Sequence, residues 1–97
     1  MRITNYEQQA IINSVVKFDN NAEIYLFGSR LDESAKGGDI DILIKSDIIK
    51  INSIFLIEEE LFSRIDEQKV DFVLTGTEVK NPFVKLILAR GAIKLWH

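Results

Sequence analysis

The sequence contains no cysteine and a single histidine, and these two absences narrow the chemistry that the chain can perform. Without cysteine there are no disulfides, no thiolate nucleophile and no zinc–cysteine site. The one histidine is His97, the last residue, and chain ends are usually mobile, so this position argues against a histidine-based catalytic site. Any chemistry must therefore rest on carboxylates, hydroxyls, basic side chains and bound metal.

The sequence also lacks an excess of basic residues and a long hydrophobic run. The formal net charge of −3 argues against direct nucleic-acid binding, which needs a basic stripe, and against attraction to an anionic membrane. No stretch approaches the ~20 apolar residues of a membrane span, and the first residues show no apolar core of a signal peptide. We therefore expect a cytoplasmic protein that contacts neither nucleic acid nor membrane.

What is present is the composition of an ordinary folded protein, with 46% hydrophobic and 28% charged residues. The 97 residues are enough for one compact domain and too few for two, so residues 1–97 are expected to form a single domain. A domain of this size buries only a modest core. A partner subunit, in a homo- or hetero-oligomer, would add stability.

Apolar spacing and turn signals predict helices and strands in mixed order. Thr4 and Glu7 form a capping-box pattern that opens the first helix, and Pro82 suits the first turn of the last. The predicted elements are a helix from Thr4 to about Phe18, a strand at Glu23–Gly28, a strand at Asp39–Ile44, a helix at about Asn52–Ile65, a strand at Lys69–Gly76, a helix from Pro82 to Gly91 and a short strand at Ala92–Trp96. This order predicts an α+β (mixed α/β) fold, in which helices pack against a small mixed sheet of about three or four strands.

Two aspartates, Asp39 and Asp41, lie one residue apart in the second predicted strand. Aspartate is depleted in strands, and two like charges on one face repel. Because side chains alternate along a strand, both carboxylates share one face, with Cα atoms about 6.6–6.8 Å apart, while the isoleucines between and after them can enter the core. Asp71 has the same apolar setting in the third predicted strand.

A divalent cation can supply the counter-charge that these carboxylates need. Mg²⁺ prefers hard oxygen ligands and typically uses one or two carboxylates together with substrate phosphates. If the third strand lies beside the second, Asp39, Asp41 and Asp71 meet on one patch. Three carboxylates suit two metal ions about 3.5–4 Å apart, which clamp the attacking and leaving oxygens of a phosphoryl or nucleotidyl transfer.

Gly28 and Ser29 end the first predicted strand, a position where α/β folds tend to place ligands. Gly28 lets a phosphate approach the backbone closely, and Ser29 offers a hydroxyl and an N–H at the start of a short helical turn. Arg30 can hold a phosphate oxygen by charge-assisted hydrogen bonds. Each feature also has a plainer interpretation: a common turn, the solvent face or edge of a strand, a solvated arginine. Their combination in this order is more specific than any part.

The order Gly28-Ser29, a spacer of nine residues and Asp39-Ile40-Asp41-Ile42 resembles the signature of the DNA polymerase β-like nucleotidyltransferase superfamily. The length and the short C-terminal portion resemble its minimal nucleotidyltransferase branch, called MNT or MntA, and the resemblance covers nearly the whole chain. Many minimal members continue G-S-R-A-R-G. This chain has G-S-R-L-D-E, so that Asp32 and Glu33 stand where an arginine and a glycine are usual.

The resemblance implies the polymerase β-like nucleotidyltransferase fold, two Mg²⁺ ions and a nucleoside triphosphate, commonly ATP, as substrate. It implies that Asp39 and Asp41 bind both metals and that Asp71 binds the catalytic metal and helps to deprotonate the acceptor hydroxyl. Gly28 and Ser29 would hold the triphosphate. Minimal members are often antitoxins encoded beside a helical HEPN-type toxin, and some add AMP to a tyrosine of that toxin.

We therefore expect a Mg²⁺-dependent nucleotidyltransferase, similar to a protein adenylyltransferase, whose partner is a HEPN-type toxin. Two alternatives remain open. In the first, the chain is a catalytically weak antitoxin that neutralises its partner by binding, as the acids after Arg30 suggest. In the second, a small molecule is the acceptor, although such enzymes usually carry a further domain for it.

Overall fold

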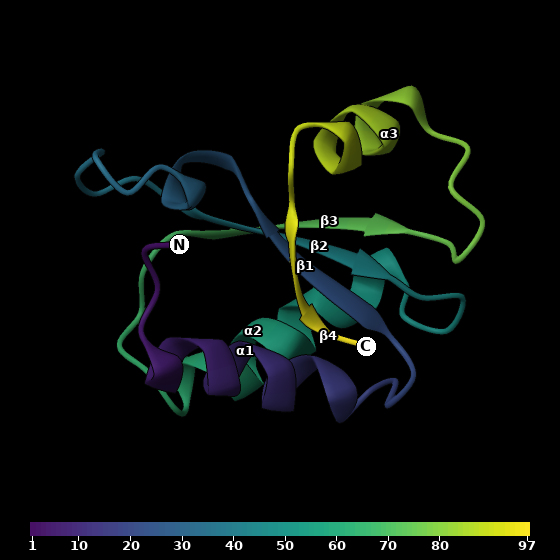
Figure 1. The fold of residues 1–97 in the computed structure, drawn as a ribbon. Coiled ribbons are helices and arrows are strands. Elements are labelled where there is room, and N and C mark those ends of the chain that lie inside the picture. The colour runs from purple at the N-terminus through teal and green to yellow at the C-terminus, as the bar shows by residue number, and fades with distance from the viewer.

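The computed structural model describes residues 1–97 and contains one four-stranded sheet with helices on both faces (Figure 1). The elements in chain order are α1 (Asn5–Val16), β1 (Glu23–Phe27), the 3-10 turn η1 (Gly28–Leu31), β2 (Ile40–Lys45), the 3-10 turn η2 (Ile51–Ser53), α2 (Ile54–Phe62), β3 (Val70–Thr75), α3 (Pro82–Ala89) and β4 (Ile93–Trp96). The predicted α+β fold with a small mixed sheet is confirmed.

The helix starts follow the capping signals of the sequence. Thr4 Oγ1 accepts a hydrogen bond from the Glu7 amide at 3.0 Å, and Glu7 Oε1 accepts one from the Thr4 amide at 2.9 Å, which completes the predicted capping box. Pro82 is the first residue of α3, and Asn81 caps that helix by accepting from the Phe83 amide at 2.8 Å.

The second helix is shorter than the predicted span of Asn52–Ile65. Residues 51–53 form the 3-10 turn η2 instead, and no side chain caps the start of α2. At its other end the Arg64 amide donates to the Leu61 carbonyl, three residues back, so the last turn tightens and the α-helix ends at Phe62.

The strand order in the sheet is β3-β2-β1-β4. β2 pairs antiparallel with β1 and parallel with β3, and β1 pairs antiparallel with β4. A parallel pair needs a long crossover between its strands, and η2 with α2 provides it. The prediction that the third strand lies beside the second is therefore confirmed.

The main core lies on the face of the sheet that α1 and α2 cover (Figure 1). Ile40, Ile42 and Ile44 of β2 are fully buried there, as the alternation predicts. On the opposite face α3 covers Leu43, which packs with the α3 residues Val84 and Ile87 in a smaller cluster. The two clusters bury the middle of β2 on both sides. None of the helices has the length and apolar content needed to cross a bilayer.

The packing of α3 leads to a stability prediction. Leu43→Ala removes a fully buried side chain from the small cluster that holds α3 on the sheet, so the free energy of unfolding should fall by about 2–5 kcal/mol. Urea denaturation measures this loss. Leu56→Ala is the control, because Leu56 lies on α2 with 48% of its surface exposed and its truncation should cost less than ~1 kcal/mol. Equal losses for the two variants would contradict this account of α3.

Candidate active site

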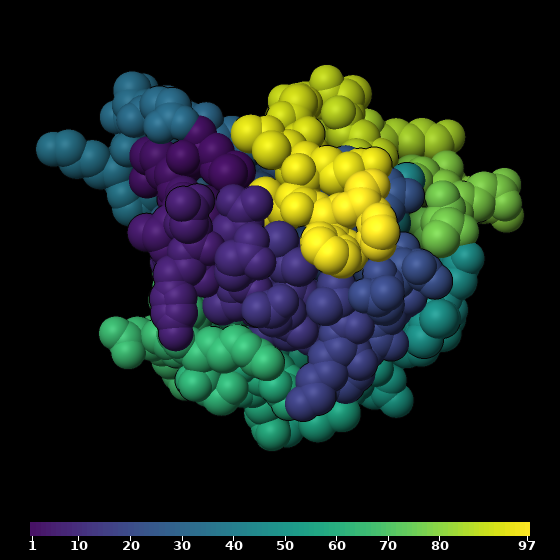
Figure 2. Space-filling view, turned by 60° about the horizontal axis from the view of Figure 1, so that its bottom comes forward, coloured from purple at the N-terminus to yellow at the C-terminus, as the bar shows by residue number.

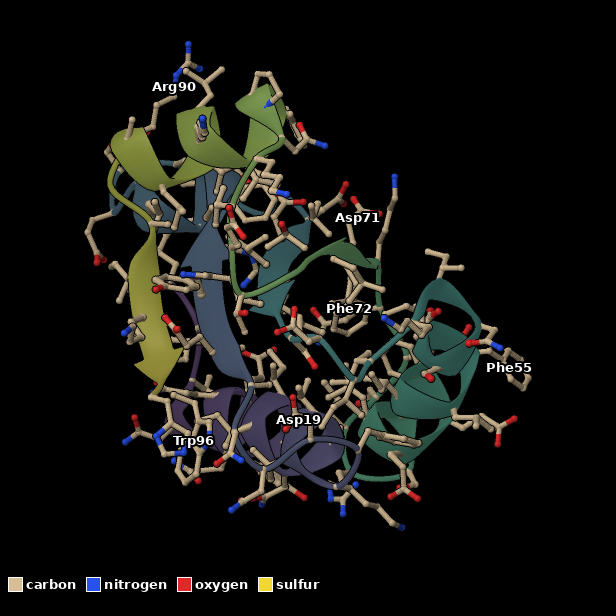
Figure 3. All side chains as sticks on the ribbon, turned by 90° about the vertical axis from the view of Figure 1, so that its right-hand side faces the viewer. Asp19, Phe55, Asp71, Phe72, Arg90 and Trp96 are labelled. Carbon is tan, nitrogen blue, oxygen red and sulfur yellow. The ribbon has the colours of Figure 1, made fainter.

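A row of three side chains runs across the sheet on the α3 side, at the point where β1 ends. Phe27 of β1 pairs with Asp41 of β2, and Asp41 pairs with Asp71 of β3. The three share a face because they alternate with core residues, as Asp71 and Phe72 do in Figure 3. We call Phe27, Asp41 and Asp71 the carboxylate row.

α3 covers the neighbouring row and the Phe27 end of the carboxylate row, and it leaves the two aspartates open. Tyr25, Leu43 and Val73 pair across the same three strands one step further along, and all three pack in the cluster beneath α3. Beyond the edge of that helix, Asp41 is half-buried and Asp71 is exposed. The sheet thus presents two adjacent carboxylates at the border between an apolar cover and solvent.

The third predicted carboxylate, Asp39, lies one residue before β2 and is half-buried. Its Oδ2 atom pairs with the Lys69 Nζ atom at 3.4 Å. No motif singles out Lys69, although its position two residues before Asp71 places it on the same side of the chain by alternation. Lys69 is the one cation that forms an ion pair with any of the three predicted site aspartates.

The electrostatics of the row indicate a surplus of negative charge. Burial raises the pKa of the Asp41 carboxyl, and the nearby charges of Asp71 and Asp39 raise it further, while Lys69 opposes the shift. No three acidic or histidine side chains of residues 1–97 approach closely enough to form a ready-made metal cage. The donor set nevertheless consists of carboxylate oxygens, which a hard divalent cation prefers, and such a cation would neutralise the surplus charge.

Gly28 lies directly against the carboxylate row. Its φ of +80° is one that side-chain-bearing residues rarely adopt, and a Cβ atom at this position would lie only 2.2 Å from the Asp41 Oδ2 atom. Gly38 has an equivalent relation to Ser29, with a φ of +89° and only 2.4 Å between a Cβ atom and the Ser29 Oγ atom. The Gly28-Ser29 turn and the start of β2 can approach this closely only because both positions are glycine.

The predicted helical turn after Gly28 is present as η1, which spans only four residues. A turn this short has little macrodipole, so it offers local N–H groups and the Ser29 hydroxyl rather than the field of a long helix. The structure thus places the Gly28-Ser29 turn beside Asp41, with Gly28 directly against the carboxylate, and phosphate binding by this turn stays a prediction.

Arg30 was predicted to hold a phosphate oxygen, but in the structure its side chain contacts backbone carbonyls. Its guanidinium donates from Nε to the Gly38 carbonyl at 3.1 Å and from Nη1 to the Arg2 carbonyl at 2.8 Å. Arg2 in turn donates from Nη2 to the Ser29 carbonyl at 3.0 Å and from Nε to the Asp32 carbonyl at 2.6 Å. Two arginine side chains therefore hold the turn in place, and at least part of the Arg30 guanidinium is used on backbone rather than on a ligand.

The N-terminal segment was not predicted to belong to the site, and no local motif at Arg2 indicates it. The Arg2 amide donates to the Arg30 carbonyl at 2.7 Å, so backbone as well as side chain joins this segment to η1. In Figure 2 the purple N-terminal residues lie against the blue segment that follows β1. Asp32, which departs from the usual family motif, accepts hydrogen bonds from the Ser34 amide and hydroxyl and so closes its own turn.

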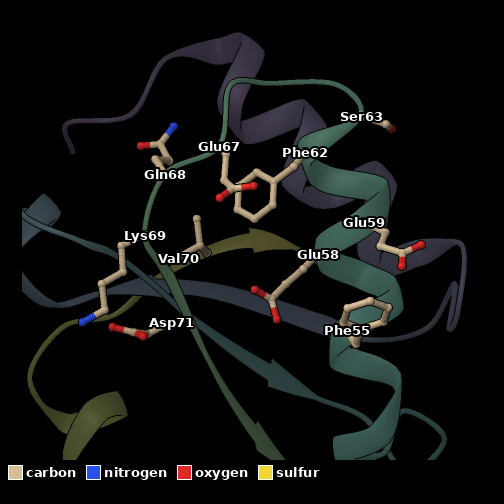
Figure 4. A pocket seen from close by; sticks show the side chains of 10 residues that line it. All are labelled: Phe55, Glu58, Glu59, Phe62, Ser63, Glu67, Gln68, Lys69, Val70 and Asp71. Carbon is tan, nitrogen blue, oxygen red and sulfur yellow. The ribbon is translucent and has the colours of Figure 1, made fainter.

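Two hollows flank the carboxylate row. The larger, of about 790 Å³, lies on the Asp71 side between β3 and α2, and only three of its ten lining residues are hydrophobic (Figure 4). Glu58 points from α2 toward the strand there, and Lys69 lies beside Asp71. The smaller, of about 500 Å³, lies on the Gly28 side between η1 and α3 and is mostly apolar.

Comparison with known protein families agrees with this geometry. The profile of a family described as "Nucleotidyltransferase domain" matches residues 9–95. The match runs from α1 into β4 and includes the Gly28-Ser29 turn and all three predicted site aspartates. A search of curated proteins finds no significant match to the chain.

The raised pKa of Asp41 predicts how the stability of the metal-free protein depends on pH. The folded state holds the Asp41 proton more tightly than the unfolded state, whose pKa lies near 3.8, so the stability from this proton is complete below that pH and is lost as pH rises through the raised pKa. Asp41→Asn removes this pH-dependent loss of stability, because asparagine carries no titrating proton. The variant should be more stable than wild type at pH 7 in chelator-treated buffer, and the difference should shrink toward pH 3.8.

Urea denaturation at several pH values, each without metal, measures this difference. Asp66→Asn is the control, because Asp66 is an exposed carboxylate outside the row and its neutralisation should bring no comparable pH-dependent gain. A gain that is equal for both variants would show that net charge, and not repulsion within the row, is responsible.

The close approach of Gly28 to Asp41 predicts a sharp difference between two glycine substitutions. Gly37→Ala meets nothing within 4 Å and suffers only the strain of its φ of +64°, a cost of about 1–2 kcal/mol. Gly28→Ala suffers similar strain and also drives a methyl group into the Asp41 carboxylate. Its free energy of unfolding should therefore fall by clearly more than that of Gly37→Ala, as measured by urea denaturation. Equal costs would contradict the close packing of Gly28 against Asp41.

Proposed function

Because the chain belongs to the nucleotidyltransferase-domain family, we propose that it transfers AMP from ATP, with Mg²⁺, to a hydroxyl group of a partner protein. Nucleotidyl transfer is the activity of this family, and members generally use a nucleoside triphosphate and Mg²⁺. One observation carries the proposal: Asp41 and Asp71 stand in register on neighbouring strands, with the Gly28-Ser29 turn against Asp41.

Each site residue has a role in this proposal. Asp39, Asp41 and Asp71 would hold Mg²⁺, which when bound supplies positive charge to the phosphates and the acceptor oxygen. The hydroxyl and amide of Ser29, with the open backbone of Gly28, would bind the triphosphate. Lys69 already pairs with Asp39 and lies close enough to the row to oppose the pKa shift of Asp41. Arg2 and Arg30 keep the turn in position rather than touching the substrate.

The chemical step is a substitution at the α-phosphorus of ATP. The acceptor oxygen forms a bond to this phosphorus while the bond to the bridging oxygen of the β-phosphate breaks. Pyrophosphate leaves with the electron pair of the broken bond, and the proton of the acceptor hydroxyl passes to the Asp71 carboxylate. The products are the adenylylated acceptor and pyrophosphate, so atoms and charges balance.

The position of Asp71 supports a macromolecular acceptor. β3 lies at an edge of the sheet, and Asp71 on it is exposed, so a hydroxyl on the surface of another protein can reach it. The resemblance to minimal nucleotidyltransferases supports the further proposal that the partner is a HEPN-type toxin, that the acceptor is one of its tyrosines and that the chain is its antitoxin.

A second candidate function is neutralisation of the same partner by binding alone. Its support is the state of the turn after Ser29, where Arg30 donates to backbone carbonyls and Asp32 brings a negative charge close to the triphosphate position. Both features would weaken nucleotide binding relative to the usual motif, in which an arginine stands at the position of Asp32.

The test uses ATP labelled at the α-phosphate, Mg²⁺, the whole chain and the product of the neighbouring gene, which the proposal expects to be a HEPN-type protein. Wild type and the control Asp66→Asn should label the partner, and Asp41→Asn should reduce the label to background, because it removes a metal-binding carboxylate from the centre of the row. Complex formation is measured in parallel by size-exclusion chromatography. If the partner forms a stable complex with wild type but acquires no label, transfer is refuted and neutralisation by binding is favoured.

A further inference from the structure

The hollow between η1 and α3 lies beside the carboxylate row, and the proposed transfer assigns it no role. The part of the chain that ends β1 and forms η1 contributes Phe27, Gly28, Leu31 and the adjoining Asp32, and α3 with its C-cap contributes Phe83, Leu86, Ile87 and Arg90. The volume of about 500 Å³ falls within the range of small-molecule sites. We call it the η1–α3 hollow.

The hollow is continuous with the proposed phosphate-binding turn. Gly28 lines the hollow and also lies against Asp41, and Phe27 is the β1 member of the carboxylate row. A molecule whose phosphates lie at Gly28 and Ser29 therefore has the hollow as its immediate neighbour on one side. On the other side of the row lie Asp71 and the edge of the sheet.

The chemistry of the walls suits a flat aromatic group with polar edges. Five of the eight lining residues are hydrophobic. Phe83 and Leu86 keep 55% and 46% of their surfaces exposed there, although α3 has a buried face on the sheet. Arg90, at the C-terminal end of α3, extends into solvent in Figure 3 and forms no ion pair in the structure, so it is free to meet a polar ring edge.

The larger hollow on the Asp71 side has the opposite character. Only three of its ten lining residues are hydrophobic, and Glu58, Glu59 and Glu67 add negative charge to that of Asp71. An anionic nucleotide would be repelled from that side. In the η1–α3 hollow the one acid, Asp32, is offset by one base, Arg90, whereas in the larger hollow four acids stand against the single base Lys69. The two hollows therefore give the row a mostly apolar side and an acidic side.

We propose that the η1–α3 hollow binds the nucleobase of the donor nucleotide. This inference rests on the proposed transfer from a nucleoside triphosphate and adds where the base lies. The base occupies the hollow against Phe83 and Leu86, the triphosphate lies at Gly28 and Ser29, and the acceptor approaches from the Asp71 side. Phe83 is thus a binding residue that no motif indicates.

The first experiment compares the binding of ATP and of inorganic tripolyphosphate, each with Mg²⁺, by calorimetry. Wild type should bind ATP more tightly, because only ATP fills the hollow. Phe83→Ala should weaken ATP binding by roughly five- to 150-fold, the range expected for loss of an aromatic contact to a base, and leave tripolyphosphate binding unchanged. The control is Phe55→Ala, which removes a phenylalanine that is 66% exposed on α2 beside the other hollow and should change neither.

A second measurement does not depend on the stability of one variant. In the wild-type protein with Mg²⁺ and ATP, nuclear Overhauser contacts should connect the adenine protons to the methyl groups of Leu31 and Leu86, which line the hollow. Phe83→Leu, which keeps the bulk of the side chain and removes the ring, should lie between wild type and Phe83→Ala in ATP affinity.

The outcomes separate the two proposals. If ATP and tripolyphosphate bind equally well and Phe83→Ala changes neither, the base does not occupy the hollow, although nucleotide binding at Gly28 and Ser29 stands. An effect of Phe55→Ala on ATP alone would place the base in the other hollow and overturn the inference in the same way. If wild type binds neither compound, the proposed transfer fails and the base site fails with it.

Discussion

The parallel pairing of β2 with β3 is the constraint on which the site depends. It fixes Asp41 beside Asp71, and alternation along both strands then decides that their neighbours Ile40, Ile42 and Phe72 enter the core. A slip of one residue in either strand would send a carboxylate into the core and an apolar side chain into solvent. The burial of the isoleucines therefore also holds the register that brings the two aspartates together.

The position of α3 is the second constraint. This helix covers the row that contains Leu43 and stops short of Asp41 and Asp71, so one side of the sheet is both a packed interface and an open surface. Partial burial raises the pKa of Asp41, yet the carboxylate keeps access to solvent. A helix that covered the whole face would bury the charge of Asp41 without a partner. Without α3, in contrast, Leu43 would be exposed to solvent.

The sequence is sufficient to predict the parts of the fold and site that depend on local pattern. The capping box at Thr4, the alternation around Asp41 and the turn at Gly28 and Ser29 each depend on residues close together in the chain, and the structure agrees with these predictions. The metal ligands, ATP and the partner remain predictions. The predicted strand began at Asp39, whereas in the structure β2 begins one residue later, at Ile40.

Other features of the site depend on contacts between distant segments, which no local pattern encodes. The pairing of Lys69 with Asp39 requires the parallel register of the strands that follow them. One of the two hydrogen bonds of Arg30 to backbone carbonyls has its acceptor on Arg2, a residue 28 positions away. The charge of Arg30, considered alone, predicts a phosphate-binding residue. In the structure its guanidinium donates hydrogen bonds to backbone carbonyls and so helps to hold the loop.

The hydrogen bonds of Arg2 also affect how a working fragment of the protein should be delimited. The family match covers residues 9–95, and a gene fragment cut at those limits would retain every residue of the recognised motif. It would lose Arg2, the donor that holds the carbonyls of Ser29 and Asp32, together with the Thr4 cap of α1. Such a fragment would keep the chemical groups of the site and lose part of the support that orients them.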